Sequence, residues 1–357
     1  MKALYITSVV TFSGKTALCL GLGLYMQSRG LKIGYMKPVS LQDYRIGNQI
    51  VDEDAEFVRR VLRLEMSASE LAPVILSNTL LDSLMEGTVQ RDFWADMRQT
   101  YEQAGQGKDV LLLEGGGSMR DGSSVGLSTV EVVHDLNIPT LAVIRWRDLG
   151  HVLDDVAAAK RRIGDKLYGV VINSVPETAW EKAKTKVAPY LESVGIPVFG
   201  VLPHQRELQA ITIGELIALL DAEVLTGEHM ASRLVENLSV GAMTVESALP
   251  LFRRTINKAV ITGGDRTDLQ AAALETSTAS LILTGNLQPS ATIVRRAEEL
   301  GVVVLLVSHT TMEAVEKIES VMGRTRLGQA EKLNRFQAML AEHLDYERLL
   351  KGLDLNN

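Results

Sequence analysis

The sequence predicts an α/β fold, with a parallel sheet covered by helices on both faces and a smaller α/β domain after it. Three observations predict this. The length of 357 residues suits two domains. Hydrophobic residues make up 46% of the chain and charged residues 23%, as in a folded globular protein. Apolar runs of strand length alternate with segments of helical period, which is the pattern of βαβ units.

The first domain is expected to contain six strands. Continuous apolar runs predict strands at 3–7, 32–36, 109–114, 140–144, 168–173 and 198–202. Segments of helical period lie at 15–28, 54–64, 92–103, 129–136, 152–163 and 179–194. Strands that are apolar throughout are typical of a parallel sheet buried on both faces.

The pattern changes after about residue 205, which predicts a second, smaller α/β unit. A helix is expected at 213–220, strands at 223–225, 259–262, 280–283 and 302–307, and a further segment at 240–249. We predict domains at 1–208 and 209–325 and a C-terminal helical tail at 326–357, with the boundary near 205–212.

The helical tail at 327–350 is rich in both charge signs. Met339, Leu340, His343 and Leu344 are candidates for one packing face. Because the polar face is not strongly basic, the pattern is more typical of a docking or oligomer helix than of a membrane helix.

Charge and cysteine content exclude several classes. The net charge of −7 argues against a nucleic-acid-binding protein, since phosphate backbones are held by dense Lys/Arg surfaces. Cys19 is the only cysteine, so no intrachain disulfide can form. The six histidines have no zinc-ligand spacing. No apolar stretch of about 18 residues occurs, so a cytoplasmic protein without membrane contact is expected.

A phosphate loop is predicted where the first strand turns into its helix. The residues expected to bind nucleotide there are Phe12, Ser13, Gly14, Lys15, Thr16 and Ala17. A strand-to-helix loop aims backbone N–H groups at an anion, the lysine reaches the β/γ-phosphates and the threonine hydroxyl ligates Mg²⁺. The usual first glycine would fall at Val9, so the alternative is a plain turn that spells Gly-Lys-Thr.

An ordered series of strand-end motifs follows this loop. The motifs are 34–39 (GYMKPV), 52–55 (DEDA), 113–117 (LEGGG), 169–173 (GVVIN) and 200–203 (GVLP). This series resembles the dethiobiotin synthetase and cobyrinic acid diamide synthase group of P-loop proteins over about the first 205 residues.

The second half resembles the DRTGG domain, through 240–244 (VGAMT) and 261–268 (ITGGDRTD), although it departs from the literal name. The pairing of the two domains is that of the N-terminal regulatory region of long phosphotransacetylases. The resemblance implies an ATP- and Mg²⁺-binding regulatory protein. The acetyltransferase domain of that family is expected to have no room here.

The resemblance assigns a metal site to Thr16, Asp54 and Glu114. Carboxylates and a hydroxyl suit Mg²⁺, whereas the alternative for Asp54 is a helix N-terminal charge. Glu114 follows apolar residues on a strand, and a buried carboxylate needs a partner. Lys15 and Lys37 are the candidate catalytic residues, and Lys37 would hold phosphate or substrate. The alternative for Lys37 is an ordinary exposed lysine without a role in the site.

The remaining nucleotide contacts are predicted at Asn173 and Pro203. Asn173 is placed on the adenine edge or, alternatively, in a cap of the following turn. The glycines at 115–117 form either a loop around phosphate or a plain turn. A ligand loop is predicted in the second domain, where backbone N–H groups and an arginine would bind an anion. The alternative is that the Asp-Arg pair of this loop is a structural salt bridge. The loop consists of Gly263, Gly264, Asp265 and Arg266.

Two functions from different classes follow. The first is a regulatory module in which ATP binding changes how the second domain or a partner behaves. The partner would be a protein of acyl-phosphate or acetate metabolism, and the chain a homo-oligomer, with a dimer through the second domain. The alternative is an ATP-dependent synthetase that phosphorylates a carboxylate or carbamate. A third reading is a structural relic that binds nothing.

Overall fold

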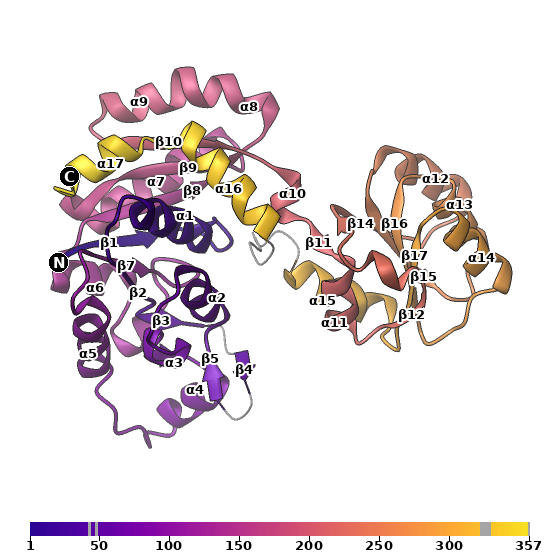
Figure 1. Ribbon diagram of the computed structural model, residues 1–357, viewed down its shortest axis with the longest axis horizontal. Coiled ribbons are helices and arrows are strands. Elements are labelled where there is room, and N and C mark those ends of the chain that lie inside the picture. Colours follow the sequence, from indigo (N-terminus) through magenta and orange to yellow (C-terminus); the bar gives the residue numbers. More distant parts are fainter. Residues whose placement is uncertain (42–43, 47–48, 322–329, 356–357) are drawn as a thin grey trace. The chain divides into compact units, whose positions relative to one another are not determined.

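The computed structural model describes residues 1–41, 44–46, 49–321 and 330–355 (Figure 1). Contacts divide the chain into two compact units, Met1–His204 with Leu327–Asn357, and Gln205–Arg326. The contacts therefore group the C-terminal tail with the first unit. The domain limits proposed from the sequence stay a prediction.

The first unit is built on a six-stranded parallel sheet in the order β10-β9-β8-β1-β7-β2. Its strands are β1 (Lys2–Thr7), β2 (Ile33–Met36), β7 (Val110–Glu114), β8 (Thr140–Arg145), β9 (Leu167–Val175) and β10 (Val198–Pro203). The predicted parallel sheet is confirmed, because each of these strands overlaps a predicted apolar run. Central strand β1 lies between β7 and β8, so the chain reverses its direction of travel across the sheet there, which is where such folds bind ligands.

Helices cover both faces of this sheet. They are α1 (Lys15–Ser28), α2 (Glu53–Leu62), α5 (Phe93–Gly105), α6 (Thr129–Leu136), α7 (Leu149–Ile163), α8 (Glu177–Lys182) and α9 (Ala188–Ser193), the last two joined by a π-helical turn at Ala183–Val187. Alternate residues of the strands, including Leu111 and Ile144, pack with Met97 of α5, Val133 of α6 and Val152 of α7. Helix α1 lies on the opposite face.

Between β2 and α5 the chain makes short elements that the sequence did not predict. They are β3 (Val39–Ser40), β4 (Tyr44–Ile46), β5 (Gln49–Val51), α3 (Ala68–Leu71), β6 (Val74–Ile75) and α4 (Asn78–Met85). Apart from α4, which has eight residues, these pieces have two to four residues and carry too few side chains to show a period. The Ser67 and Ser77 side chains cap α3 and α4, which is why these helices begin there.

The second unit has a sheet in the order β12-β17-β16-β15-β14, in which β12 alone is antiparallel. The strands are β12 (Glu223–Thr226), β14 (Asn237–Val240), β15 (Lys258–Gly263), β16 (Thr278–Thr284) and β17 (Val303–Leu306), with a separate pair β11 (Ile211–Thr212) and β13 (Leu234–Val235). Its helices are α10 (Arg206–Gln209), α11 (Ile213–Leu220), α12 (Val245–Arg254), α13 (Thr267–Leu274), α14 (Ala291–Glu299) and α15 (Thr311–Val321). Strands β11, β13 and β14 and helices α10, α14 and α15 were not predicted.

The tail forms two helices, α16 (Ala330–His343) and α17 (Tyr346–Gly352). Figure 1 shows these yellow helices beside β10 and α1 of the first unit. Leu344 lies between them and makes a β-bridge with Gly200 on the edge of β10. The side chains of Met339, Leu340 and Leu344 are buried, so the predicted packing stripe docks on this chain itself. Residues 327–329 of the predicted tail lie outside the described residues.

Candidate functional site

The backbone of the loop between β1 and α1, where nucleotide binding is predicted, turns through two residues with positive φ. Gly14 has φ 98° and Phe12 has φ 52°, both in the left-handed region, whereas Val9 does not. The loop therefore places its left-handed residues at 12 and 14 and needs no glycine at position 9. A Cβ on Gly14 would lie 2.4 Å from the Asn173 Nδ2 atom, so the close approach also requires glycine.

The Lys15 ammonium group lies inside this loop. It donates to the Ser8 Oγ atom at 3.0 Å and to the Gly117 carbonyl at 3.2 Å, and the residue is only 7% exposed. Burial lowers the pKa of Lys15, against the opposing effect of Glu114. The glycine segment that follows β7 thus lies next to the phosphate-loop lysine, as the loop reading of residues 115–117 requires.

Thr16 and Glu114 form the oxygen-rich part of the site. The Thr16 hydroxyl donates to Glu114 Oε1 at 2.6 Å, and the Tyr35 hydroxyl donates to Glu114 Oε2 at 2.8 Å. Burial raises the pKa of Glu114 to about 7, although Lys37 opposes the shift. A hydroxyl beside a carboxylate fits a hard divalent cation such as Mg²⁺.

Lys37 is buried and paired with two carboxylates. Its ammonium lies 2.9 Å from Asp52 Oδ2 and 2.7 Å from Asp54 Oδ2. Burial by itself lowers the pKa of Lys37, but Asp52 and Asp54 outweigh it, so the pKa is raised well above its usual value. Lys37 is therefore not the ordinary exposed lysine of the alternative reading, and Asp54 is its ion partner.

Asp52 is a site residue to which the sequence assigned no role. Its Oδ1 accepts from the Ala55 backbone N–H at 2.6 Å, which caps α2, and its other oxygen accepts from Ser40 as well as pairing with Lys37. The signal was available, since an aspartate directly before a helical segment is an N-cap pattern. Its pairing with a lysine fifteen positions earlier is a tertiary contact.

Asn173 supports the phosphate loop rather than facing open space. Its Nδ2 donates to the Ser13 carbonyl at 2.8 Å, and its Oδ1 accepts from the Ser174 N–H at 2.8 Å. The second bond is to the adjacent backbone N–H, so both the adenine contact and the turn cap stay predictions. Arg145, which pairs in register with Asn173, also reaches the loop, at the Phe12 carbonyl.

The other residues predicted to bind nucleotide lie at different distances from the phosphate loop. Ser13 is 1% exposed, and its hydroxyl has no hydrogen-bond partner among the described residues. Ala17 is buried in the first turn of α1. Pro203 ends β10, which is separated from β1 by β9 and β8. Pro203 therefore shares the carboxyl edge of the sheet but not the immediate surroundings of the loop.

In the second unit, Gly263, Gly264, Asp265 and Arg266 form a turn at the end of β15, in which the Arg266 N–H donates to the Gly263 carbonyl at 3.1 Å. The Arg266 guanidinium pairs with both oxygens of Asp268 at 3.0 Å and donates to the Met243 carbonyl at 3.0 Å. The salt bridge thus forms with Asp268 rather than with the adjacent Asp265. Binding of a ligand by this turn stays a prediction.

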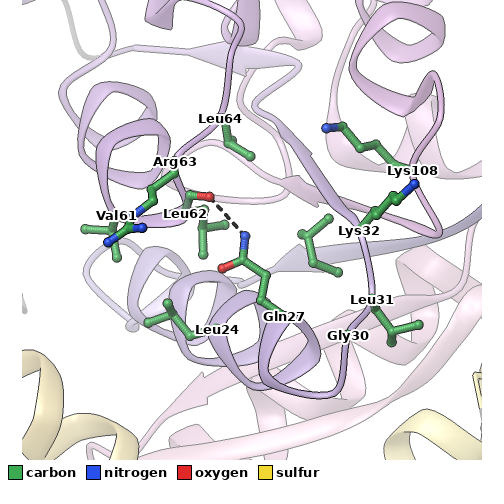
Figure 2. A pocket seen from close by; sticks show the side chains of 11 residues that line it. Leu24, Gln27, Gly30, Leu31, Lys32, Val61, Leu62, Arg63, Leu64 and Lys108 are labelled. Carbon is green, nitrogen blue, oxygen red and sulfur yellow. Dashed lines mark hydrogen bonds between the residues drawn. The ribbon is translucent and has the colours of Figure 1, made fainter.

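A separate cavity of about 600 Å³ lies where α1 and α2 end, at the amino edge of the sheet (Figure 2). Gln27 crosses it to donate to the Leu62 carbonyl at 2.9 Å. Lys32, Arg63 and Lys108 lie around it, and cations at helix C-termini complement the helix dipoles. None of the predicted site residues lines this cavity, so it is distinct from the phosphate loop.

Two absences concern only the part of the chain that the structure describes. In those residues, no group of three or more His, Cys, Asp and Glu side chains is arranged to hold a metal ion. The predicted magnesium ligands Thr16, Asp54 and Glu114 include only two carboxylates, so they would not form a group of this size. No helix within the described ranges is long and apolar enough to cross a bilayer.

Comparison with known families assigns both halves of the chain. Residues 2–212, more than half of the chain, match the family model described as an AAA domain. The chain belongs to this family. Residues 215–321 match the DRTGG domain. The resemblance to P-loop proteins followed by a DRTGG domain is thereby confirmed.

Curated relatives give the same picture. A phosphate acetyltransferase of Nitrosomonas europaea is 24% identical over 372 residues, which cover 98% of this chain and 52% of the relative. An ATP-dependent dethiobiotin synthetase of Caldicellulosiruptor bescii is 26% identical over 180 residues, which cover 48% of this chain and 74% of the relative. The chain thus spans about half the length of the acetyltransferases that it matches.

One solved structure that resembles this AAA-family chain contains the CBS and DRTGG domains of the regulatory region of Clostridium perfringens pyrophosphatase, complexed with its activator diadenosine tetraphosphate. It is 19% identical, covers 42% of this chain and 74% of that one, and has a TM-score of 0.29. A score that low carries no argument about this chain.

Proposed function

We propose that this chain is an ATP- and Mg²⁺-binding regulatory protein of the phosphotransacetylase-associated type. The observation that carries the proposal is the buried Lys15 ammonium at the β1–α1 turn, next to the Thr16–Glu114 pair. Lys15 would meet the phosphates, because its present partners, Ser8 Oγ and the Gly117 carbonyl, are neutral oxygens that a phosphate oxygen replaces with a stronger, charge-assisted bond.

Magnesium has oxygen ligands ready in this site. Thr16 and Glu114 would hold the ion, with Asp54 as the third predicted ligand, and the bound ion would neutralise phosphate charge. Asp54 is partly exposed, and one of its oxygens is paired with Lys37. Glu114 is the better-placed carboxylate, because Thr16 joins it directly to the phosphate loop.

The two ion pairs of Lys37 favour a regulatory function over the synthetase alternative. A synthetase needs a cation free to hold the substrate carboxylate while ATP phosphorylates it. Lys37, the residue predicted for that task, is neutralised by Asp52 and Asp54 in a buried site. To bind an acidic substrate it would have to give up one of these ion pairs, which is costly in a region of low dielectric constant.

Isothermal titration with ATP·Mg²⁺ on the wild type and Lys15→Ala tests the proposal. We expect the substitution to weaken binding at least about tenfold, since a hydrogen bond to a charged group contributes about 1.5–3 kcal/mol. Lys32→Ala, which removes an exposed lysine of the same unit, is the control and should bind like the wild type.

Phosphate release with added carboxylic acids separates the two functions. Binding that depends on Lys15 with no acid-dependent release supports regulation, and release that requires an acid supports the synthetase. No nucleotide binding by the wild type would contradict both functions.

We further propose a homodimer formed through the second domain and a protein partner in acetate or acyl-phosphate metabolism. Light scattering of the purified chain tests the dimer.

A further inference from the structure

Tyr35 lies on the same face of the sheet as Glu114. Tyr35 of β2 pairs in register with Leu112 of β7, and Glu114 is two residues further along β7. Side chains two apart on a strand share a face, so Tyr35 is the diagonal neighbour of Glu114 and an aromatic side chain can reach it. Both residues are at least 99% buried.

The two oxygens of the Glu114 carboxylate have different donors. Oε1 accepts from the Thr16 hydroxyl in the first turn of α1, at 2.6 Å. Oε2 accepts from the Tyr35 hydroxyl in the sheet, at 2.8 Å. The last torsion of a glutamate is soft, so a single donor leaves the carboxylate plane free to turn. Two donors, one on each oxygen, fix it.

We propose that Tyr35 is a positioning residue for the magnesium site: its hydroxyl holds Glu114 Oε2 so that Oε1 stays beside the Thr16 hydroxyl, where the divalent ion binds. This inference rests on the proposed function and deepens it. The competing role is purely structural, in which Tyr35 fills the core and satisfies its own buried hydroxyl on Glu114.

Tyr35→Phe separates these roles, because it keeps the ring and removes only the hydroxyl. ATP affinity is measured with excess Mg²⁺ and again with EDTA. We expect the gain in affinity that Mg²⁺ provides to fall about tenfold, the usual size of an outer-shell effect on metal binding. The affinity in EDTA should stay that of the wild type. Tyr25→Phe, which removes the hydroxyl of an α1 residue that contacts Arg29, is the matched control.

The outcomes are distinct. An unchanged Mg²⁺ gain in Tyr35→Phe, or equal losses with and without Mg²⁺, overturns the positioning role and leaves the proposed function standing. A wild type that binds ATP equally with and without Mg²⁺ overturns the inference and the magnesium assignment. A wild type that binds no ATP overturns the proposed function together with the inference.

A second measurement covers the case in which Tyr35→Phe does not fold. The full chain is prepared with 3-fluorotyrosine at position 35, which keeps the hydroxyl and nearly the volume. Adding Mg²⁺ to the ATP-bound protein should move the fluorine resonance, because the hydroxyl contacts the carboxylate that takes the ion. A resonance that moves with ATP but not with Mg²⁺ contradicts the inference.

Discussion

Single residues in this site act by cancelling charge in a region with little water. Lys37 is neutralised by Asp52 and Asp54, while the Glu114 carboxylate is held by two hydroxyl groups. Both pKa values rise, but for different reasons. The pKa of Lys37 rises because its ion pairs outweigh burial, and the pKa of Glu114 rises because burial outweighs the nearby lysines.

The raised pKa of Glu114 predicts a dependence of stability on pH. The folded-state pKa of about 7 lies above the ordinary value of 4.5, so the folded chain holds this proton more tightly than the unfolded chain. The contribution of Glu114 is complete below pH 4.5 and is lost as pH rises towards 7. Without metal, the free energy of unfolding should therefore fall relative to that of Glu114→Gln across this window.

Urea unfolding in EDTA at several pH values checks this prediction. The comparison is the difference between the wild type and Glu114→Gln, since glutamine is neutral at every pH and other titrations cancel. A difference that is constant from pH 4.5 to 7, or that changes with the opposite sign, would show that Glu114 is not held in its protonated form.

Among individual residues, sequence reasoning found the ones with strong chemical signatures. Lys15 and Thr16 were identified from the loop motif, and Glu114 from a carboxylate at the end of an apolar strand; the structure brings all three together. Asp52 and Tyr35 received no role, because their importance comes from a partner on another element. The functional roles themselves stay predictions.

Among the elements, α1 matters most, because it begins with the phosphate-loop lysine and carries the C-terminal tail on its side. A Cβ at Gly21 of α1 would collide with Leu340 Cδ1 and lie 3.2 Å from Phe336 Cε1 of α16. Glycine at this position lets the two helices approach closely. The stack of Tyr25 on Tyr346, at 3.8 Å between ring centroids, extends the contact to α17.

Gly21→Ala should therefore destabilise the first unit. Overpacking of a filled contact costs about 1–3 kcal/mol, and Leu340→Ala, which opens a cavity, about 2–5 kcal/mol. The double variant should lose less free energy of unfolding than the two single variants lose together, because the new methyl group enters the space left by the leucine. Chemical denaturation of the four proteins measures the coupling.

The control for this prediction is Gly150→Ala. Gly150 lies in the first turn of α7, and its Cβ would meet only Asp148 Oδ1, at 3.4 Å. Alanine has the higher helix propensity, so this variant should be at least as stable as the wild type. Additive effects of Gly21→Ala and Leu340→Ala would contradict the contact between α1 and α16.

At the scale of the whole molecule, the chain leaves its first unit after His204 and returns to it at the C-terminal helices. The second unit is one continuous stretch with its own core on both faces of its sheet. One side packs around Leu216 and Ile318, and the other around Phe252 and Ile293. The first unit is assembled from two separate stretches.

This arrangement predicts which fragments fold. Residues 205–326 expressed alone should unfold cooperatively, because their hydrophobic core is internal to the fragment. Residues 1–204 alone should be less stable than 1–204 joined by a short flexible linker to 330–355, since the tail covers Gly21 of α1 and the open edge of β10. Circular dichroism melts compare the three proteins. Equal stability with and without the tail would contradict the prediction.

The parallel sheet, the two α/β halves and the P-loop and DRTGG families could be predicted from the sequence, and so could a candidate phosphate loop after the first strand. Each rests on local information: apolar runs, helical period and a short motif read along the chain. The short elements between β2 and α5 have weak local signals, and what they pack against decides their structure. Helices α14 and α15 were also missed, although α14 is amphipathic and begins after a serine N-cap.

The tertiary structure sets which groups meet at the site. Lys15 bonds a carbonyl 102 positions away, Thr16 bonds a carboxylate 98 positions away and Tyr35 bonds the same carboxylate from 79 positions away. It also decided that the amphipathic tail docks on its own first unit. The physical reason is that hydrogen bonds, ion pairs and buried area depend on distance in space, which chain separation does not encode.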